Sequence, residues 1–352
     1  MPVSFGLLHL SFSRRRKIKV FTEWHHGGLF HAQVLLWQKR MGGQVFGPVG
    51  YEWVKAGYWR LSGKPETQKQ YLEPGYCHQR GDGKLYYFDK AENINQRRIS
   101  LDNFKKEKFD VILCTLQEHE KSFRWLRDQY QPQAAYIRLV GNTGEQVDWD
   151  RFDNFIDTTG LYQPPSRINS IKIAQEFPLD TFYYKEPENH TTVTNLMNCL
   201  KEADAYQIWL WLKGKLPDWK FFMHGSLGDD GMIDGLSALG DKIRDSAFIF
   251  QVKHHGEGFG HVIHNAYACG RPVITVAEFY RGKLAERFLI DGFSAILLDD
   301  KSPDEALEQI KYFADPQRHK QMCENARGLF EKYVDFDDDF KRFKIFLTNL
   351  RY

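Results

Sequence analysis

The stretch QVKHHGEGFGHVIHNAYACGRPVIT, residues 251–275, decides the fold class of this chain. Its spacing predicts a helix from about Phe259 to Cys269, because Gly270 follows as a helix stop and Pro272 lies just beyond it. The apolar runs on either side, AFIFQV and RPVITV, are typical of buried strands. A strand, a turn, a helix and a second strand in this order predict one unit of a parallel α/β sheet.

The turn inside this stretch has the composition of an anion-binding site. Gly256, Gly258 and Gly260 carry no side chains, so a phosphate could approach the backbone and the positive N-terminal end of the helix. Such turns bind ligands in the crevice above the carboxyl ends of parallel strands. Glu257 would repel a phosphate, and its carboxylate is better suited to accept hydrogen bonds from neutral hydroxyls. A sugar joined to a phosphate meets both conditions.

Short β-rich runs alternate with helical segments along the rest of the chain, which extends the α/β prediction to its whole length. KIKVFTEW, residues 17–24, reads as a first strand, and HHGG then leads into a helix from Leu29 to Met41. The run GLYQPPSR, residues 160–167, is the best candidate for a linker, because two consecutive prolines block both a helix and a central strand.

A chain of 352 residues is longer than one hydrophobic core usually serves, so we expect two domains. The first sheet should end before the proline linker. The second domain should open with SIKIAQEF and continue as a long helical region through Lys213. The predicted units are an N-terminal extension (1–16), a first α/β domain (17–162), a second α/β domain (163–335) and a C-terminal helix (336–352).

Composition places the chain among globular proteins, with 42% hydrophobic and 27% charged residues. Its five cysteines are scattered and never form a CxxC pair, which argues against a disulfide framework or a cysteine zinc site and favours the cytoplasm. At the N-terminus a basic cluster follows an apolar run, the reverse of a secretory signal. No apolar run is long enough to span a bilayer.

Charge is divided unevenly, although the net charge is only +2. Residues 1–150 carry 23 Lys and Arg against 16 Asp and Glu, and the remainder carries 25 against 30, so the two parts are +7 and −5. A basic first domain favours an anionic partner, either nucleic acid or a membrane surface, and an ordinary solvated surface explains it equally well. Aromatic residues mixed with Lys and Arg between residues 51 and 100 indicate an insertion or a binding surface.

The ordered string HHGEGFGHVIHNAYACGRPVIT, with the later LIDGFSAILLDD and the earlier FPLDTF, resembles the signature of the retaining nucleotide-sugar glycosyltransferases of GT-B fold. The resemblance is dense over residues 245–315 and weaker over 17–50 and 108–182. It implies two Rossmann-like domains that face a cleft. The C-terminal domain would bind the nucleotide sugar, UDP- or GDP-linked, and the N-terminal domain would bind the acceptor.

The resemblance also implies the residues of the site. Glu257 would be the catalytic residue at the donor sugar. Asn265 stands where the family keeps a second glutamate for the ribose hydroxyls, and an amide can still accept and donate a hydrogen bond. The family's basic pair for the diphosphate has no clear counterpart, so Lys185, Arg281 and Lys283 are substitutes by charge. The expected donor-binding residues are Gly28, His255, Gly258, Phe259, Gly260, Asn265, Arg281 and Lys283.

The histidines of the opening stretch permit a second interpretation. His261 and His264 are three residues apart and would share a helix face, a spacing that zinc ligands use, but no acidic or cysteine third ligand falls in register with them. We therefore expect no metal site. His254 and His255 could reach the sugar or the acceptor. His25 and His26, in the upstream HHG, would lie on the acceptor side of the cleft.

The predicted activity is transfer of a sugar from a nucleotide sugar to a hydroxyl acceptor, with retention of configuration implied by the resemblance alone. No cofactor is required, because a helix end and basic residues can stabilise the departing diphosphate. The acceptor is open: a hydroxymethylated DNA base, a saccharide and a lipid all fit a basic, aromatic-rich first domain. Two alternatives remain, a binding protein of GT-B fold that has lost catalysis and a sugar-nucleotide epimerase.

Overall fold

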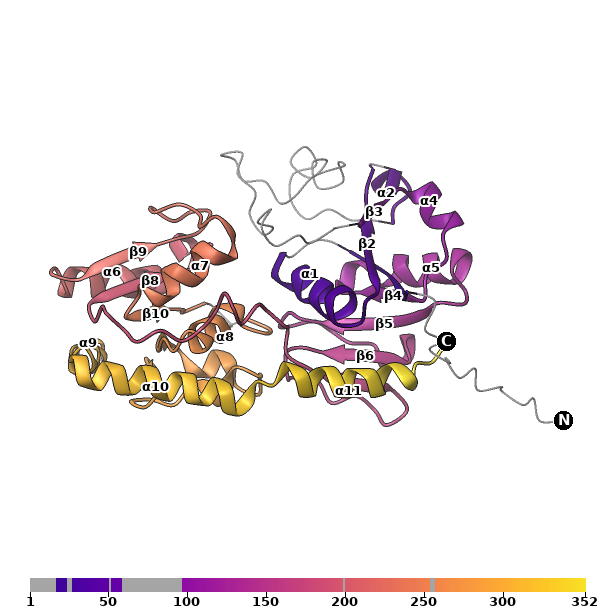
Figure 1. Ribbon diagram of the computed structural model, residues 1–352. Helices are drawn as coiled ribbons and strands as arrows, with labels where there is room; N and C mark the ends of the chain where they lie inside the picture. The colour runs from indigo at the N-terminus through magenta and orange to yellow at the C-terminus, as the bar shows by residue number, and fades with distance from the viewer. Residues whose placement is uncertain (1–16, 24–26, 51, 59–96, 199, 254–256) are drawn as a thin grey trace.

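The computed structural model of the chain describes residues 17–23, 27–50, 52–58, 97–198, 200–253 and 257–352. These residues fold into two α/β domains that lie side by side, each built on a fully parallel sheet (Figure 1). The predicted α/β class is therefore confirmed. The predicted N-terminal extension, residues 1–16, lies outside the described residues.

The first sheet has seven strands in the order β3-β2-β1-β4-β5-β6-β7. Strands β4 and β5 are buried along their whole length, as expected for parallel strands covered by helices on both faces. The strands are β1 (Lys19–Thr22), β2 (Gln44–Pro48), β3 (Arg97–Ile99), β4 (Val111–Cys114), β5 (Ala135–Val140), β6 (Asn154–Asp157) and β7 (Asn169–Lys172).

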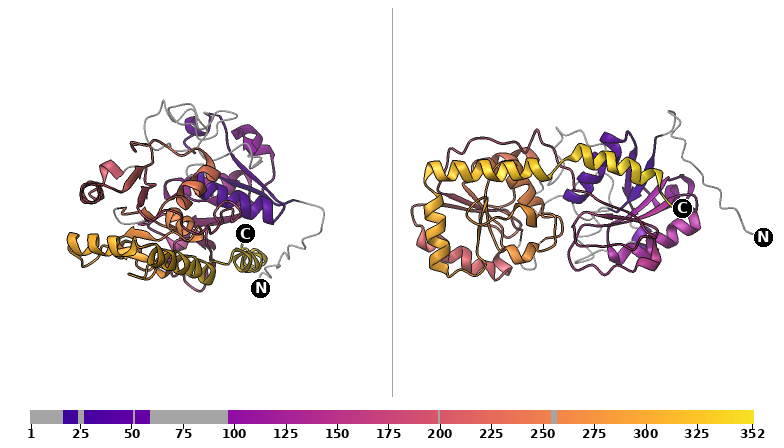
Figure 2. Two further views of the ribbon diagram at one scale, coloured as in Figure 1. Left: turned by 60° about the vertical axis from the view of Figure 1, so that its left-hand side comes forward. Right: turned by 90° about the horizontal axis from the view of Figure 1, so that it is seen from below.

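Helices cover both faces of this sheet, and the C-terminal helix is one of them. Trp37 packs edge-on against Phe343 with ring centroids 4.8 Å apart, so the end of the chain belongs to the core of the first domain. Seen from below, α10 and α11 run one after the other across both domains (Figure 2). The helices of this domain are α1 (Gly27–Gln33), the π-helix η1 (Val34–Arg40), α2 (Glu52–Lys55), α4 (Leu101–Lys106), η4 (Gln117–His119), α5 (Glu120–Tyr130), η5 (Trp149–Arg151) and α11 (Phe336–Thr348).

The first sheet extends past the expected boundary between residues 162 and 163. Strand β7, which we expected to open the second domain, pairs in parallel with β6, and Asn154 lies opposite Asn169. Pro164 and Pro165 lie in the loop between these two strands. The prolines therefore stiffen a connection within the first domain, and the chain crosses to the second domain only after β7.

The second sheet has five strands in the order β12-β11-β10-β8-β9. Its strand β8 lies inside the region predicted to be one long helical segment through Lys213, and that prediction was wrong. The run Thr192–Asn195 is fully buried and rich in β-branched residues, and the Thr194 hydroxyl accepts a hydrogen bond from Ser246 at 2.6 Å. The strands are β8 (Thr192–Asn195), β9 (Lys220–Met223), β10 (Phe248–Phe250), β11 (Val273–Thr275) and β12 (Ala295–Leu297).

Helix α8 lies close to where the sequence predicts it, and α6 ends near the predicted Lys213 but begins only at Ala205. Ser302 caps α9 in a capping box with Glu305, and Pro303 occupies the first position of the helix, where proline is favoured. No helix in the described part of the chain is both long and apolar enough to cross a bilayer. The helices are η6 (Leu200–Glu202), α6 (Ala205–Lys215), α7 (Gly235–Arg244), α8 (His261–Ala268), η7 (Ala277–Tyr280), η8 (Glu286–Phe288), α9 (Pro303–Phe313) and α10 (Pro316–Tyr333).

One aromatic residue predicted to belong to a binding surface is part of the core instead. Trp53 of α2 is fully buried, stacks on Phe21 with ring centroids 5.2 Å apart, and donates its indole N–H to the Ile99 carbonyl at 3.2 Å. A buried tryptophan commonly satisfies its N–H in this way. Trp59, Tyr71, Tyr76, Tyr86 and Tyr87 lie outside the described residues.

Candidate functional site

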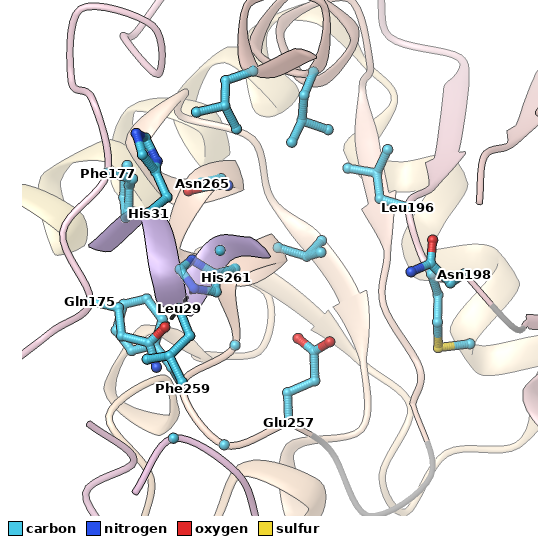
Figure 3. Close-up of a pocket in the computed structure, with 18 of the residues that line it drawn as sticks. Leu29, His31, Gln175, Phe177, Leu196, Asn198, Glu257, Phe259, His261 and Asn265 are labelled. Carbon is cyan, nitrogen blue, oxygen red and sulfur yellow. Dashed lines mark hydrogen bonds between the residues drawn. The ribbon is translucent and has the colours of Figure 1, made fainter. Parts of the chain in front are cut away.

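A cavity of about 520 Å³ lies between the two domains, where the carboxyl ends of strands from both sheets meet. The first domain contributes the start of α1 and the loop after β5. The second domain contributes the loops after β8 and β9 and the turn before α8 (Figure 3). The residues that line it include Gly28, Leu29, His31, Gly141, Asn142, Thr143, Leu196, Met197, Asn198, His224, Lys253, Glu257, Gly258, Phe259, Gly260, His261 and Asn265.

The predicted glycine turn forms one wall of this cavity. Gly260 adopts φ +77° directly before α8, a left-handed conformation that glycine adopts at little cost. Among the described residues no side chain caps this helix, and no acidic residue lies in its first turn. Because the first N–H groups of a helix lack partners within the helix, this end of α8 can attract an anion in the cavity.

Gly258 has a role that the sequence did not indicate. A Cβ atom at this position would lie 1.9 Å from the Gly141 carbonyl oxygen and 2.8 Å from the Asn142 Cα atom of the first domain. Both distances are far below van der Waals contact. The missing side chain at Gly258 therefore allows the two domains to touch at the edge of the cavity.

Glu257 directs its carboxylate into the cavity (Figure 3). One oxygen, Oε1, accepts a hydrogen bond from Lys253 Nζ at 3.2 Å. The other, Oε2, is buried and has no hydrogen-bond partner among the described residues. A buried carboxylate oxygen without a partner is costly, and a ligand hydroxyl could satisfy it.

Asn265 presents a second unpartnered oxygen. It lies on α8 one turn after His261, lines the cavity and is only 6% exposed. Its Oδ1 atom has no hydrogen-bond partner within the described ranges. Asn265 thus offers a neutral acceptor that faces the same cavity as Glu257.

His261 and His264 point in different directions and do not share a ligand. His261 Nε2 lies 2.7 Å from Gln175 Oε1, while the fully buried His264 ring stacks on Phe259 at 3.9 Å and its Nδ1 lies 3.0 Å from the Gly260 carbonyl oxygen. Burial lowers the pKa of His264 to about 3, so this ring is neutral. Among the residues described, no group of three or more His, Cys, Asp or Glu side chains could hold a metal ion.

The two basic residues expected at the diphosphate do not line the cavity. Arg281 is 74% exposed and forms an ion pair with Glu278. Lys283 is buried and donates to the Phe279 carbonyl. Burial lowers the pKa of Lys283, and the negative charge of Glu257 opposes this shift only in part. The physical reason is that the segment around them docks on the first domain, where the Leu284 N–H donates to the Thr159 carbonyl at 2.7 Å. Lys185 is exposed and pairs with Glu188.

Three predicted site residues, His25, His26 and His255, lie outside the described residues. Their proposed places at the sugar and across the cleft stay predictions. Gly28, which lies in helix α1, does line the cavity, so the start of α1 and the turn before α8, although far apart in sequence, contribute to one site.

Several cavity residues escaped the reading of the sequence. His31 lies on α1, where burial and the charge of Lys39 lower its pKa to about 4 and keep it neutral. His224 follows β9, and burial lowers its pKa as well. Lys253 carried a usable signal, because it directly follows a predicted strand and precedes Glu257 by four residues. Asn198 follows β8, a strand the sequence reading had missed.

Comparison with known proteins identifies the fold. No family model matches the chain, and no curated protein matches its sequence. Solved structures match over nearly the whole length. They include HepE of Anabaena in complex with UDP and glucose, at 10% identity and a TM-score of 0.63, covering 95% of this chain and 100% of that one.

Two further matches have similar values. Sucrose-phosphate synthase of Thermosynechococcus elongatus is 13% identical with a TM-score of 0.59, and the pneumococcal O-GlcNAc transferase GtfA, in complex with UDP and GlcNAc, is 12% identical with a TM-score of 0.58. Each covers 94% of this chain and 98% of its own. At this level of identity the likeness establishes the fold, and the chain has the GT-B fold.

Proposed function

We propose that this chain is a glycosyltransferase that moves a sugar from a nucleotide-sugar donor to a hydroxyl acceptor. The observation that carries this proposal is the wall formed by Glu257, the start of α8 and Asn265. Its free carboxylate and amide oxygens can accept hydrogen bonds from sugar hydroxyls, and they lie beside a helix end that can bind an anion. The solved structures of the same fold that contain UDP, with glucose or GlcNAc, support it.

The donor fits this wall in one orientation. The diphosphate lies at the N-terminal end of α8, the sugar hydroxyls donate to Glu257, and the ribose hydroxyls donate to the free Asn265 oxygen. The nucleotide is UDP or GDP. No cofactor takes part in this scheme.

The reaction is the exchange of two bonds at the anomeric carbon. The bond from that carbon to the phosphate oxygen breaks, and its electron pair leaves with the diphosphate. The acceptor oxygen bonds to the same carbon, and its proton passes to the departing phosphate oxygen. The protein orients the two substrates. Glu257 stabilises the positive charge that develops on the sugar, and the N-terminal end of α8 stabilises the negative charge of the leaving group. Retention of configuration belongs to this proposal.

The acceptor approaches from the first domain. There the described cavity wall is neutral, formed by Gly28, Leu29, His31, Asn142 and Thr143. Such a wall suits an uncharged hydroxyl compound at the reacting position. A DNA acceptor stays a prediction, because the aromatic and basic residues that motivated it lie largely outside the described residues. We place the reaction in the cytoplasm, which the free thiols of Cys114, Cys269 and Cys323 favour.

The test is a product assay with UDP-glucose, UDP-GlcNAc and GDP-mannose, each with and without a saccharide, a lipid and a hydroxymethylated DNA duplex as acceptor. Release of the nucleoside diphosphate together with a new glycoside is the expected result, and NMR coupling at the anomeric proton reports retention. Binding without turnover would favour the non-catalytic alternative. Isomerisation of the donor sugar without any acceptor would favour an epimerase. If DNA is the acceptor, the protein must bind the duplex, and added salt must weaken that binding.

A further inference from the structure

The described walls of the cavity contain very few positive charges. Among their residues, Lys253 is the single Lys or Arg. Two acidic residues, Glu176 and Glu257, line the same space, and Glu176 is already paired with Arg40 at 2.6 Å. A diphosphate brings several negative charges into the cavity, and a cation on its walls is needed to balance them.

Two histidines on these walls, His31 and His224, do not supply that charge at neutral pH. Burial lowers the pKa of His31 and of His224 below the ordinary histidine value, so both rings are neutral. Arg281 pairs with Glu278 at the surface, and the Lys283 ammonium donates to the Phe279 carbonyl; neither residue lines the cavity. Lys201, which follows β8, is paired with Asp229 and does not line the cavity.

Lys253 is placed where a leaving group would need it. It follows β10 at the carboxyl end of the sheet and lies on the same wall as the start of α8. Its side chain is 41% exposed, against 21% for Glu257, and its Nζ atom lies 3.2 Å from Glu257 Oε1. Ion pairs with this degree of exposure contribute little stability, so Lys253 can change partners at small cost.

Resting on the function proposed above, we propose that Lys253 is the cation that binds the donor diphosphate, and that its ion pair with Glu257 opens when the donor arrives. The ammonium then moves from the carboxylate to the phosphate oxygens. Both Glu257 oxygens become available to the sugar hydroxyls at the same moment. The pair keeps the empty site neutral and couples the binding of the diphosphate to the release of the catalytic carboxylate.

The experiment measures the Kd of bare UDP and of bare GDP by calorimetry, because neither carries a sugar for Glu257 to bind. Lys253→Met should weaken binding of whichever nucleotide the wild type binds by about tenfold to a hundredfold, the range for a lost hydrogen bond to a charged group. Lys253→Arg should restore it to within about threefold. Lys215→Met, an exposed lysine at the end of α6, is the matched control and should leave Kd unchanged.

A double variant separates a contact with phosphate from simple exposure of the Glu257 charge. If Lys253 touches the diphosphate, Lys253→Met combined with Glu257→Gln still binds about tenfold more weakly than Glu257→Gln alone. Equal affinity of those two proteins would overturn the inference, since Lys253 would then only mask a repelling carboxylate.

Salt provides an independent readout of the same contact. Raising the NaCl concentration should weaken nucleotide binding more steeply in the wild type than in Lys253→Met, because one ionic contact is missing from the variant. If Lys253→Met and the wild type have the same Kd and the same salt dependence, Lys253 does not bind the diphosphate, while the proposed function is unaffected. Absence of UDP and GDP binding in the wild type would overturn both.

Discussion

Two segments that contain glycine contribute to the cavity, the start of α1 and the turn between β10 and α8, and they differ in chemistry. The turn of the second domain brings an acid, a lysine and an amide to the wall, in Glu257, Lys253 and Asn265. The start of α1 brings only Gly28, Leu29 and the neutral His31. The wall from the second domain therefore carries charged side chains, and the start of α1 offers none. This difference supports assigning the donor to the second domain.

Among the substitutions that test this assignment, Glu257→Gln should have the largest effect on activity. Loss of a carboxylate that faces the developing positive charge should lower kcat by about a hundredfold to a thousandfold, the range found when one electrostatic group is removed from an active site. Steady-state transfer kinetics measure it. The amide keeps the size of the side chain, so the fold should be unchanged.

Glu278→Gln is the matched control for that experiment. Glu278 is an exposed glutamate on η7 that pairs with Arg281 outside the cavity. Its substitution should leave kcat and KM as they are. A Glu257→Gln enzyme with wild-type kcat would contradict the donor-side role of this turn.

The second prediction concerns the contact between the domains. Gly258→Ala places a Cβ atom 1.9 Å from the Gly141 carbonyl oxygen, so the turn or the whole domain must move back. Displacement of the catalytic wall by about 1 Å can cost on the order of a hundredfold in rate. Transfer kinetics and the radius of gyration by small-angle scattering report the two parts of this effect.

Gly214→Ala makes the same chemical change where there is room. An added Cβ on this α6 glycine meets nothing within 4 Å, so activity should be unchanged and the helix slightly more stable. If Gly258→Ala behaves like Gly214→Ala, the close approach of Gly258 to Gly141 is not needed for function.

The third prediction compares one histidine from α1 with one from α8. His31 and His264 have pKa values of about 4 and about 3, both below the ordinary 6.5, so they stay neutral in the fold and take up protons on unfolding. Because the unfolded chain binds more protons below pH 6.5, the free energy of unfolding should fall as the pH drops, by at most about 2 kcal/mol per histidine between pH 7 and pH 5.

Denaturant unfolding of His31→Gln and His264→Gln at these two pH values measures the effect. Each substitution should flatten the loss of stability between pH 7 and pH 5, whatever it does to stability at pH 7. A slope equal to that of the wild type in either variant would mean that the histidine is charged in the folded protein.

The smallest expected effect belongs to Asn265. Asn265→Ala removes one hydrogen-bond acceptor for the donor and should raise the Kd of the nucleotide sugar by about fivefold to tenfold. Calorimetry measures it, with Asn325→Ala as control, since the Asn325 amide donates to the Phe293 carbonyl on the surface. Unchanged affinity in Asn265→Ala would mean that the unpartnered Oδ1 atom faces no ligand hydroxyl.

Local patterns predicted much of the second domain. The helix expected over residues 259–269 is observed as α8, and the predicted glycine turn precedes it, with Gly260 in a conformation that favours glycine. These features depend on neighbouring residues, which the sequence displays directly. Strand β8 was missed because Thr-rich, alternating residues follow a loop and precede a helix, and only pairing with β9 and β10 identifies them as a strand.

The basic residues of the site also show which features follow from neighbouring residues and which depend on tertiary contacts. Arg281 and Lys283 follow a predicted strand and have the required charge, yet their segment docks on the first domain near Thr159. Lys253 lies on the cavity wall instead. Charge and position in sequence were not enough to choose among them, because the direction of a side chain at a domain interface depends on contacts made by the other domain.

The sequence by itself determined the α/β class, the glycine turn and the place of Glu257 in it, since strand and helix periodicity and glycine conformation are properties of adjacent residues. Only the tertiary structure decided that β7 belongs to the first sheet, that Gly258 is one of the points where the domains touch, and that Lys253 is the cation beside Glu257. Each of these depends on segments far apart in the chain, brought together when the two sheets close on one cavity.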